Sequence, residues 1–481
     1  MASKRDQLQA YQFMVQRVIS AIVTRESDPE QPPFRRPTTT AFASIAVAFI
    51  ALAAVGVYGL LVPGGNDAWR DGKSVIVVEE TGSRYVYLDG RLHPVLNYSS
   101  ALLALDSHAK TMSVSRNSLM DVPRGSLIGI PGAPEALPAA ERVLRSGWTL
   151  CSSPARDDTG ADVDESVLLV GHRPRGGRQL TDEALLLTVS GSGDQYLIWR
   201  GYRHLIREPD TVTVGLALRT EPHSRAGTEL LDALPEGEAI SPIKVTGIGK
   251  KSTAVPRRPD VKAGQLLVVE TEAGGTQHYL ADTEQLRPIS PLQYDIQIAY
   301  QATAKAYRDA EPTGIPLGLL AASEAVVAPD QPRPTGAAPQ GRPAFVDSGR
   351  GAPAVCATYD SGASVPQLSV AVDLPPAKRM TETAGNTEQG TPMADQVYVP
   401  PGWTAVVEAM PSSTAAAGAL LVVTDQGRAY PLSERDDLDV LGYGAVRPVQ
   451  LSASLIARIP LGRGLSTDAA RAPARDTNPS T

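Results

Sequence analysis

The chain has 481 residues and a formal net charge of −7, and it contains 42 glycines and 40 prolines. This length is too great for one ordinary hydrophobic core and indicates several domains. The acidic balance argues against a nucleic-acid partner, because proteins that bind nucleic acids usually present a basic face. The six histidines are scattered, with no pair at metal-ligand spacing, so no metal centre is expected.

The N-terminal segment, residues 4–28, has apolar residues at nearly helical spacing. The spacing predicts an amphipathic helix within a cytoplasmic region, residues 1–40. Its candidate partner-binding residues are Leu8, Tyr11, Val15, Val18, Ile19 and Ile22. Two interpretations stay open: the helix lies on the inner membrane surface, or it docks against another cytoplasmic protein.

The next segment, residues 41–62, reads AFASIAVAFIALAAVGVYGLLV and contains no charged or strongly polar residue. As a helix it would rise about 33 Å, enough to cross the hydrocarbon core of a bilayer. A buried core helix would carry a polar stripe, and a signal peptide would have a shorter apolar run nearer the N-terminus. We therefore predict a retained transmembrane helix. Arg35 and Arg36 directly precede it, which favours a cytoplasmic N-terminus and an exported body after Val62.

The only two cysteines, Cys151 and Cys356, both follow the predicted span. Two lone cysteines in an oxidising compartment usually pair, so we predict a structural disulfide between them. The chain-entropy model gives about 5 kcal/mol for closing a loop of about 205 residues, before any strain is subtracted. A redox couple is not indicated, because the sequence has no Cys-x-x-Cys motif.

Beyond the span, four stretches pair strand-like runs across glycine-rich turns, as in Leu266 to Glu270 and His278 to Ala281. The self-similarity predicts four copies of one hairpin module. An echo supports this: SLMDVPRGSLIGIP at 118–131 resembles SLIARIPLGRGL at 454–465. We assign repeats 1 to 4 to residues 63–140, 181–260, 261–325 and 411–465.

Separate strand-like pieces around the two cysteines indicate a further domain built from residues 141–180 and 326–410, the latter with Pro/Gly-rich loops. A disulfide requires its two Cα atoms within about 7 Å, so these pieces must be adjacent. The predicted fold is therefore α+β: an amphipathic helix, one transmembrane helix, and an elongated extracytoplasmic body of four repeats around a disulfide-linked central β domain. Residues 466–481 lack apolar periodicity and are predicted to be disordered.

The search for chemistry gives no catalytic candidate. Lys73 and Lys250 lie in stretches that superficially resemble a phosphate-binding loop, which requires Gly, four residues, and then Gly-Lys-Ser or Gly-Lys-Thr. Asp67 stands where the first glycine should precede Lys73, and Lys251 separates Lys250 from the following serine. The sequence also lacks a nucleophile elbow and a dinucleotide fingerprint. We expect neither catalytic residues nor a cofactor.

Several long stretches together carry a family resemblance. They are KRDQLQAYQFMVQRVISAIV before the lone span, SLMDVPRGSLIGIPGAPEALP, GWTLC, YLIWRGYRHLI, and VVTDQGRAYPL with LGYG and SLIARIP. With these motifs the chain resembles the EccB family, a membrane component of the actinobacterial type VII (ESX) secretion system. The resemblance runs from Lys4 to about Leu465, nearly the whole chain.

The resemblance implies a single-pass subunit of a multi-protein complex in the cytoplasmic membrane. Its implied partners are the EccC motor ATPase, EccD, EccE and the mycosin protease, together with further copies of itself in a homo-oligomer. It also implies repeats similar in fold to a phage cell-wall-binding module, which suggests contact with peptidoglycan. Family members have also been labelled ATPases, although this sequence offers no phosphate loop.

Three functions follow as hypotheses. The first is a structural and assembly subunit that links cytoplasmic partners to a self-associating external body. The second is a peptidoglycan-binding anchor. The third is nucleotide hydrolysis.

Overall fold

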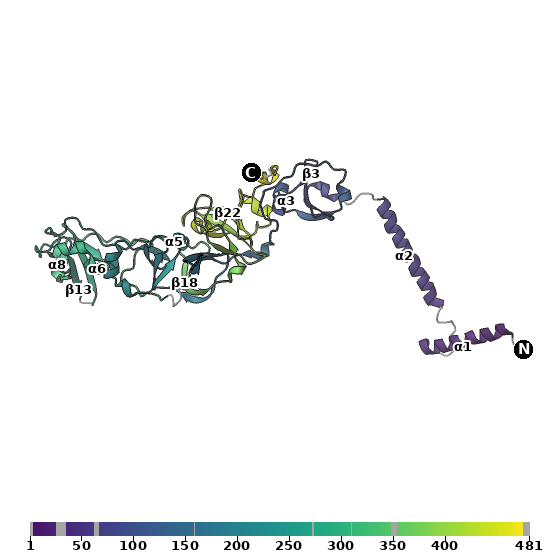
Figure 1. Cartoon of the computed structure of the whole chain (residues 1–481), viewed down its shortest axis with the longest axis horizontal. Coiled ribbons are helices and arrows are strands. Elements are labelled where there is room, and N and C mark those ends of the chain that lie inside the picture. The colour runs from purple at the N-terminus through teal and green to yellow at the C-terminus, as the bar shows by residue number, and fades with distance from the viewer. Residues whose placement is uncertain are drawn as a thin grey trace. The chain divides into compact units, whose positions relative to one another are not determined.

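The computed structural model describes residues 3–25, 35–61, 67–157, 159–271, 274–308, 310–347 and 354–474. These residues form an α+β protein, as predicted: two N-terminal helices are followed by β-sheets with short helices between their strands (Figure 1). The chain divides into two compact units. One contains the N-terminal helices with residues 77–82 and 112–122, and the other contains residues 72–76, 83–111 and the described chain from residue 123 onward.

The first unit begins with helix α1 (Lys4–Thr24). Ser3 and Asp6 form a capping box: the Asp6 N–H donates to Ser3 Oγ, and the Ser3 N–H donates to the Asp6 carboxylate at 3.0 Å. Helix α2 (Arg35–Leu61) follows, and its segment Thr39–Tyr58 has a mean hydropathy of 2.3 with none of it buried. Among the described residues it is the one helix long and apolar enough to cross a membrane.

Four sheets share one strand order, in which the first strand is central and the third lies at an edge. We call them modules 1 to 4. Module 1 contains β1 (Ser74–Val78), β2 (Arg84–Leu88), β3 (Arg91–Pro94) and β4 (Lys110–Val114). Module 2 contains β9 (Ala184–Val189), β10 (Gln195–Trp199), β11 (Tyr202–Leu205) and β12 (His223–Ala226). Module 3 contains β13 (Leu266–Glu270), β14 (Thr276–Ala281), β15 (Leu286–Ile289) and β16 (Ile315–Pro316). Module 4 contains β21 (Thr404–Met410), β22 (Ala419–Val423), β23 (Ala429–Pro431) and β24 (Val449–Ser452).

Short helices connect the strands of each module. After the third strand come α3 (Tyr98–Leu105), α4 (Pro209–Gly215), α6 (Pro291–Ala299) with α7 (Gln301–Ala304), and α9 (Asp436–Val440). After the fourth strand, modules 2, 3 and 4 continue into α5 (Thr228–Ala233), α8 (Leu319–Ser323) and α10 (Ala453–Ile456). In these three modules the fourth strand runs parallel to the first. Parallel strands need a crossover connection, and the helices between the third and fourth strands supply it.

The last part of each module, which we call its edge segment, runs beside the third strand. The edge segments are residues 123–128, 235–240, 326–331 and 460–465. In module 2 the Arg203 N–H donates to Pro235 O, Gly237 N–H to Arg203 O, Ile240 N–H to Leu205 O, and Arg207 N–H to Ile240 O, at 2.9 to 3.0 Å. Modules 1 and 4 form the same four bonds. This parallel pairing explains the echo in the sequence.

In three modules an aromatic ring of the third strand lies directly on a glycine of the edge segment. A Cβ atom on Gly125, Gly237 or Gly462 would lie within 2.5 Å of a ring carbon of His93, His204 or Tyr430, respectively. No side chain fits there, because real Cβ atoms do not approach other heavy atoms so closely. Module 3 has Arg287 instead of the ring and Ala328 instead of the glycine.

A seven-stranded central sheet has the order β19-β20-β7-β6-β17-β18-β8. Its strands are β6 (Trp148–Arg156), β7 (Asp162–Leu169), β8 (Arg175–Gln179), β17 (Val355–Tyr359), β18 (Gln367–Asp373), β19 (Thr381–Glu382) and β20 (Gln396–Tyr398). Trp148 and Leu150 belong to a core that also contains Leu185 of module 2 and Val407 of module 4. The central sheet therefore packs against both modules.

Two predicted boundaries need correction. The sequence pattern places residues 404–410 in the central domain, but they form β21 at the centre of module 4. β21 also pairs with β5 (Val143–Leu144). Pro400 and Pro401 separate β20 from β21, and prolines cannot continue a paired central strand, so one apolar run supplies strands to two sheets.

The predicted disordered tail is also wrong for its first residues. Ser466 caps a helix, α11 (Thr467–Arg471), by accepting a hydrogen bond from the Ala469 N–H at 3.2 Å. Ala470 is fully buried, and Arg471 Nε donates to Ala104 O of module 1 at 2.9 Å. Small residues after a serine cap are enough for one turn that packs against α3. Residues 475–481 lie outside the described residues.

Candidate functional site

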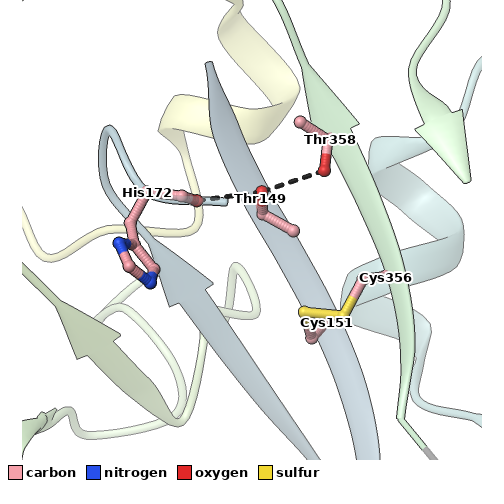
Figure 2. The surroundings of a disulfide bond; sticks show 5 residues. All are labelled: Thr149, Cys151, His172, Cys356 and Thr358. Carbon is pink, nitrogen blue, oxygen red and sulfur yellow. Dashed lines mark hydrogen bonds between the residues drawn. A yellow bond between two sulfur atoms is a disulfide. The ribbon is translucent and has the colours of Figure 1, made fainter. Parts of the chain in front are cut away.

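The predicted disulfide joins two neighbouring inner strands of the central sheet. Cys151 of β6 and Cys356 of β17 are directly opposite in the antiparallel register. Their Cα atoms are 4.0 Å apart, the S–S distance is 2.01 Å, and both residues are fully buried (Figure 2). The prediction from the cysteine count is thus confirmed. The two chain segments predicted to be adjacent are paired strands.

Polar groups continue the link between the two strands beyond the disulfide. Thr149 Oγ1 lies 3.0 Å from Thr358 Oγ1 and donates to the backbone oxygen of His172 at 3.1 Å (Figure 2). The His172 ring packs edge-on against Tyr398, with centroids 5.5 Å apart. Burial, and then the charge of Arg175, lower the pKa of His172. A neutral imidazole is therefore favoured beside the sheet.

The disulfide brackets an insertion. Cys151 and Cys356 are 205 positions apart in the sequence, and the stretch between them contains the whole of module 2 and module 3. The chain leaves the central sheet after β8, builds two modules, and returns to the sheet as β17, which lies next to β6. Closing a loop of this length stabilises the folded chain by about 5 kcal/mol in the entropic model.

A buried arginine of module 4 contacts both module 2 and the segment that precedes β20 of the central sheet. Arg458, which follows α10 of module 4, is 5% exposed, and its Nη1 donates to Pro392 O at 2.7 Å. Its Nη2 lies 3.8 Å from the Asp232 carboxylate of module 2, which also accepts from Arg203 at 3.1 Å. Burial raises the pKa of Tyr359 on the central sheet, while the charges of Arg458 and Arg203 oppose the rise. These contacts are suited to holding modules and sheet together.

The predicted partner-binding residues lie on one helix, α1. At 100° per residue they fall on one side, and the opposite side carries Asp6, Gln9 and Arg17 together with the exposed Phe13. Exposed fractions are 57% for Leu8, 68% for Tyr11, 38% for Val15, 55% for Val18 and 76% for Ile22, while Ile19 is partly exposed. The face is apolar and uncovered within the described chain. The topology residues Arg35 and Arg36 stand at the start of α2.

Neither lysine of the rejected phosphate motifs precedes a helix. Lys73 is followed directly by strand β1. Lys250 lies in a turn, where its backbone N–H donates to Gly247 O at 3.0 Å. Phosphate loops use the amides of a loop that opens a helix, so neither stretch has that arrangement. The described residues contain no group of three or more potential metal ligands.

The sequence reasoning missed the edge segments as a structural feature, although their signal was present. Pro-x-Gly followed by an aliphatic residue three positions later occurs at Gly125, Gly237 and Gly462. Aligning this pattern with the preceding His93, His204 and Tyr430 would have predicted a ring packed on a glycine. Module 3 lacks this ring and glycine, since Arg287 and Ala328 stand in their places.

These features define a class of protein: a chain with one helix suited to span a membrane, an uncovered amphipathic helix before it, and a disulfide-closed body of hairpin modules. Residues 1–480 match the family described as "Type VII secretion system ESX-1, transport TM domain B". Because the match covers nearly the whole chain, this protein belongs to that family, known as EccB. It is therefore a membrane component of a type VII secretion system.

Relatives and solved structures agree with this. The protein named "ESX-2 secretion system ATPase EccB2" of Mycobacterium tuberculosis (strain ATCC 25618 / H37Rv) is 29% identical over 493 residues, covering 99% of this chain and 96% of the relative. A chain of the intact ESX-5 inner membrane complex superposes with a TM-score of 0.65 at 23% identity, covering 100% of this chain and 97% of that one. A chain of the EccB3 dimer from the ESX-3 core complex gives 0.63 at 24% identity, covering 83% and 99%. The two structures share the fold of this chain.

Proposed function

We propose that this chain is a structural and assembly subunit of a type VII (ESX) secretion complex in the cytoplasmic membrane. In this role α1 contacts cytoplasmic partners, α2 crosses the bilayer, and the four modules with the central sheet form an extracytoplasmic body that self-associates. Family membership supports the secretion system, and the shared fold with a chain of the ESX-5 inner membrane complex supports the complex. The proposed partners are EccC, EccD, EccE and the mycosin protease.

The observation that carries the assembly role is the uncovered face of α1. Tyr11 and Ile22, eleven residues apart on one face, are 68% and 76% exposed. A helix of 21 residues that exposes such a face in water is stabilised when a partner covers it. Docking against a cytoplasmic protein is the interpretation we favour, and the membrane surface is the competing cover.

The disulfide supports the proposed orientation. Cystines persist outside the cytoplasm, so a body closed by Cys151–Cys356 belongs on the exterior. Arg35 and Arg36 before the apolar run favour the same topology. A phosphatase reporter fused after Thr481 should be active and a cytoplasmic fluorescent reporter dark. The opposite pattern would refute the orientation.

A matched pair of variants tests the docking role. Val15→Asp with Val18→Asp places two charges on the apolar face, whereas Gln9→Asp with Gln16→Asp places the same charges away from it. Affinity purification through a tag on this subunit should lose its cytoplasmic partners with the first pair and retain them with the second. An intact complex with the first pair, or after deletion of residues 4–28, would exclude α1 as the docking element.

A vesicle assay distinguishes binding of α1 to the membrane surface from docking on a protein. If α1 docks on protein alone, a synthetic peptide of residues 3–25 should not be retained by vesicles of anionic lipid. Retention that Val15→Asp abolishes would favour the membrane surface instead.

Nucleotide hydrolysis stays a second candidate because the curated relatives are named ATPases. We infer that the energy comes from a partner, since Lys73 and Lys250 lack the loop that cradles phosphates. Steady ATP turnover by the highly purified chain is the measurement that decides.

A further inference from the structure

Module 3 leaves open a position that the other modules fill. In modules 1, 2 and 4 the edge segment ends on Ile128, Ile240 and Leu465, which are at most 2% exposed. The corresponding residue of module 3 is Gln331, a polar residue that follows Pro329. Only the first two edge bonds remain, from Leu286 N–H to Val326 O at 2.7 Å and from Ala328 N–H to Leu286 O at 2.8 Å.

The missing segment leaves backbone groups of β15 available. Leu205 O and Arg207 N–H bind Ile240 in module 2, and their counterparts in module 3 are Pro288 O and Ser290 N–H. No hydrogen bond from an edge segment reaches either group within the described chain. Pro288 O points away from β14, because Leu286, two residues before it, also directs its N–H outward.

Aliphatic side chains line the interrupted edge. Ile289 is partly buried and Val327 is 40% exposed. Their equivalents in module 4, Leu432 and Leu461, are partly buried and 56% exposed although that edge is complete. The unpaired backbone groups, and not the exposure of these side chains, therefore distinguish module 3.

A cleft of about 1050 Å³ lies at this position. Pro288, Ile289 and Ser290 line it together with Val327 and Gln331. On the neighbouring strand β14, His278 also lines it, and its Nδ1 is a buried atom without a hydrogen-bond partner in the described structure. The cleft therefore combines a free strand edge, aliphatic surface and an unsatisfied polar group.

We infer that this cleft binds an extended peptide segment of another polypeptide, which pairs parallel to β15 and places an aliphatic side chain where Ile240 lies in module 2. The occupant is identified by three internal examples, since edge segments of modules 1, 2 and 4 occupy the equivalent place. The fitting chemistry is a short extended segment with Ile or Leu at its third position, because Val326 and Ala328 already pair with Leu286 where the Pro-x-Gly of the other edge segments lies. Strand addition supplies affinity through main-chain bonds and specificity through the side-chain pocket. This contact goes beyond the assembly role assigned to α1.

The probe is a fluorescent synthetic peptide with the sequence of residues 126–131, SLIGIP, which begins where the pairing of module 3 stops; it is titrated against the full-length chain in detergent and followed by anisotropy. We expect saturable binding. A peptide with aspartate in place of Ile128 should not bind, because a charge would enter the aliphatic pocket. Absence of saturable binding by the first peptide, or equal binding by both, would overturn the inference.

Two substitutions at one residue separate the backbone contact from the helix cap. Ser290→Pro removes the N–H, and the φ of −73° at Ser290 already suits proline. Ser290→Ala keeps that N–H but removes the Oγ that accepts from the Gln293 N–H at 3.1 Å. Proline should weaken peptide binding about tenfold, the size of one lost hydrogen bond, and alanine should leave it unchanged. Equal affinities for the two variants would contradict strand addition.

The site itself can be mapped on the unmodified chain. A photoreactive group at the position of Ile128 in the peptide should cross-link to β15 or to Val327, identified by mass spectrometry. Cross-links confined to β3, β11 or β23 would show exchange with an existing edge segment and would refute binding at the open cleft.

Discussion

Replacing Gly237 with alanine tests the ring-on-glycine packing most directly. The added Cβ would lie 2.5 Å from Cε1 and 2.7 Å from Nδ1 of His204, and 3.0 Å from Gly336 O. His204 is fully buried and its Nδ1 lies 2.8 Å from Glu238 O, so the ring cannot move aside without losing that hydrogen bond. The clash must therefore strain the edge segment or displace the ring.

The magnitude follows from three contributions. Overpacking a core typically costs about 1–3 kcal/mol, and loss of the His204–Glu238 bond adds about 1 kcal/mol. The lower entropy of the unfolded chain offsets about 0.4–1 kcal/mol of this. We expect Gly237→Ala to lower the free energy of unfolding by about 1–3.5 kcal/mol in module 2. A chain of several modules need not unfold in one transition, so module-resolved hydrogen exchange is the suitable assay.

A double-mutant cycle gives the decisive comparison. In a His204→Ala background the ring is gone, and Gly237→Ala should cost little, which isolates the contact between the two residues. Gly341→Ala is the matched control, because a Cβ there meets no heavy atom within 4 Å. Equal costs of Gly237→Ala with and without the ring would refute the packing argument.

Three further outcomes are expected. Replacing Cys151 and Cys356 together with serine should lower the free energy of unfolding by up to about 5 kcal/mol in denaturant titrations, and no loss would contradict the loop argument. Burial lowers the pKa of His204 below its ordinary 6.5, so the unfolded chain takes up the proton first and stability falls as the pH drops below 6.5. Melting curves from pH 7.5 to 5 should show this fall, and His204→Gln should reduce it; an identical slope would exclude this histidine as the cause. Highly purified protein should not hydrolyse ATP, and turnover that Lys73→Ala or Lys250→Ala abolishes would reverse that expectation.

The sequence predicted local structure well because hairpins depend on neighbouring residues. The runs Leu266 to Glu270 and His278 to Ala281 were predicted as paired strands, and they form β13 and most of β14 in register. The cysteine pair was predictable too, since only two cysteines exist. Both inferences need only spacing, alternation or counting.

Pairing between distant segments was not predictable in the same way. Residues 404–410 are apolar and β-branched, which is equally compatible with the central sheet and with module 4, and only the partner strands decide. The edge segments are rich in proline and glycine and lack alternation, so they gave no strand signal although they complete three sheets. α11 was missed because five residues are too short for a periodic pattern.

The position of the disulfide explains how an incomplete module can persist. Module 3 lacks two edge bonds, but it does not stand alone: Leu292 and Ile296 of its helix α6 share a core with Val212 and Leu216 of module 2. Module 2 in turn packs on the central sheet, where Cys151–Cys356 fixes both ends of the inserted stretch. Packing against module 2, and the disulfide in the central sheet, thus stabilise module 3 although its edge is incomplete. An open strand edge usually invites uncontrolled pairing, so keeping one on a braced module is consistent with a reserved contact for a specific peptide.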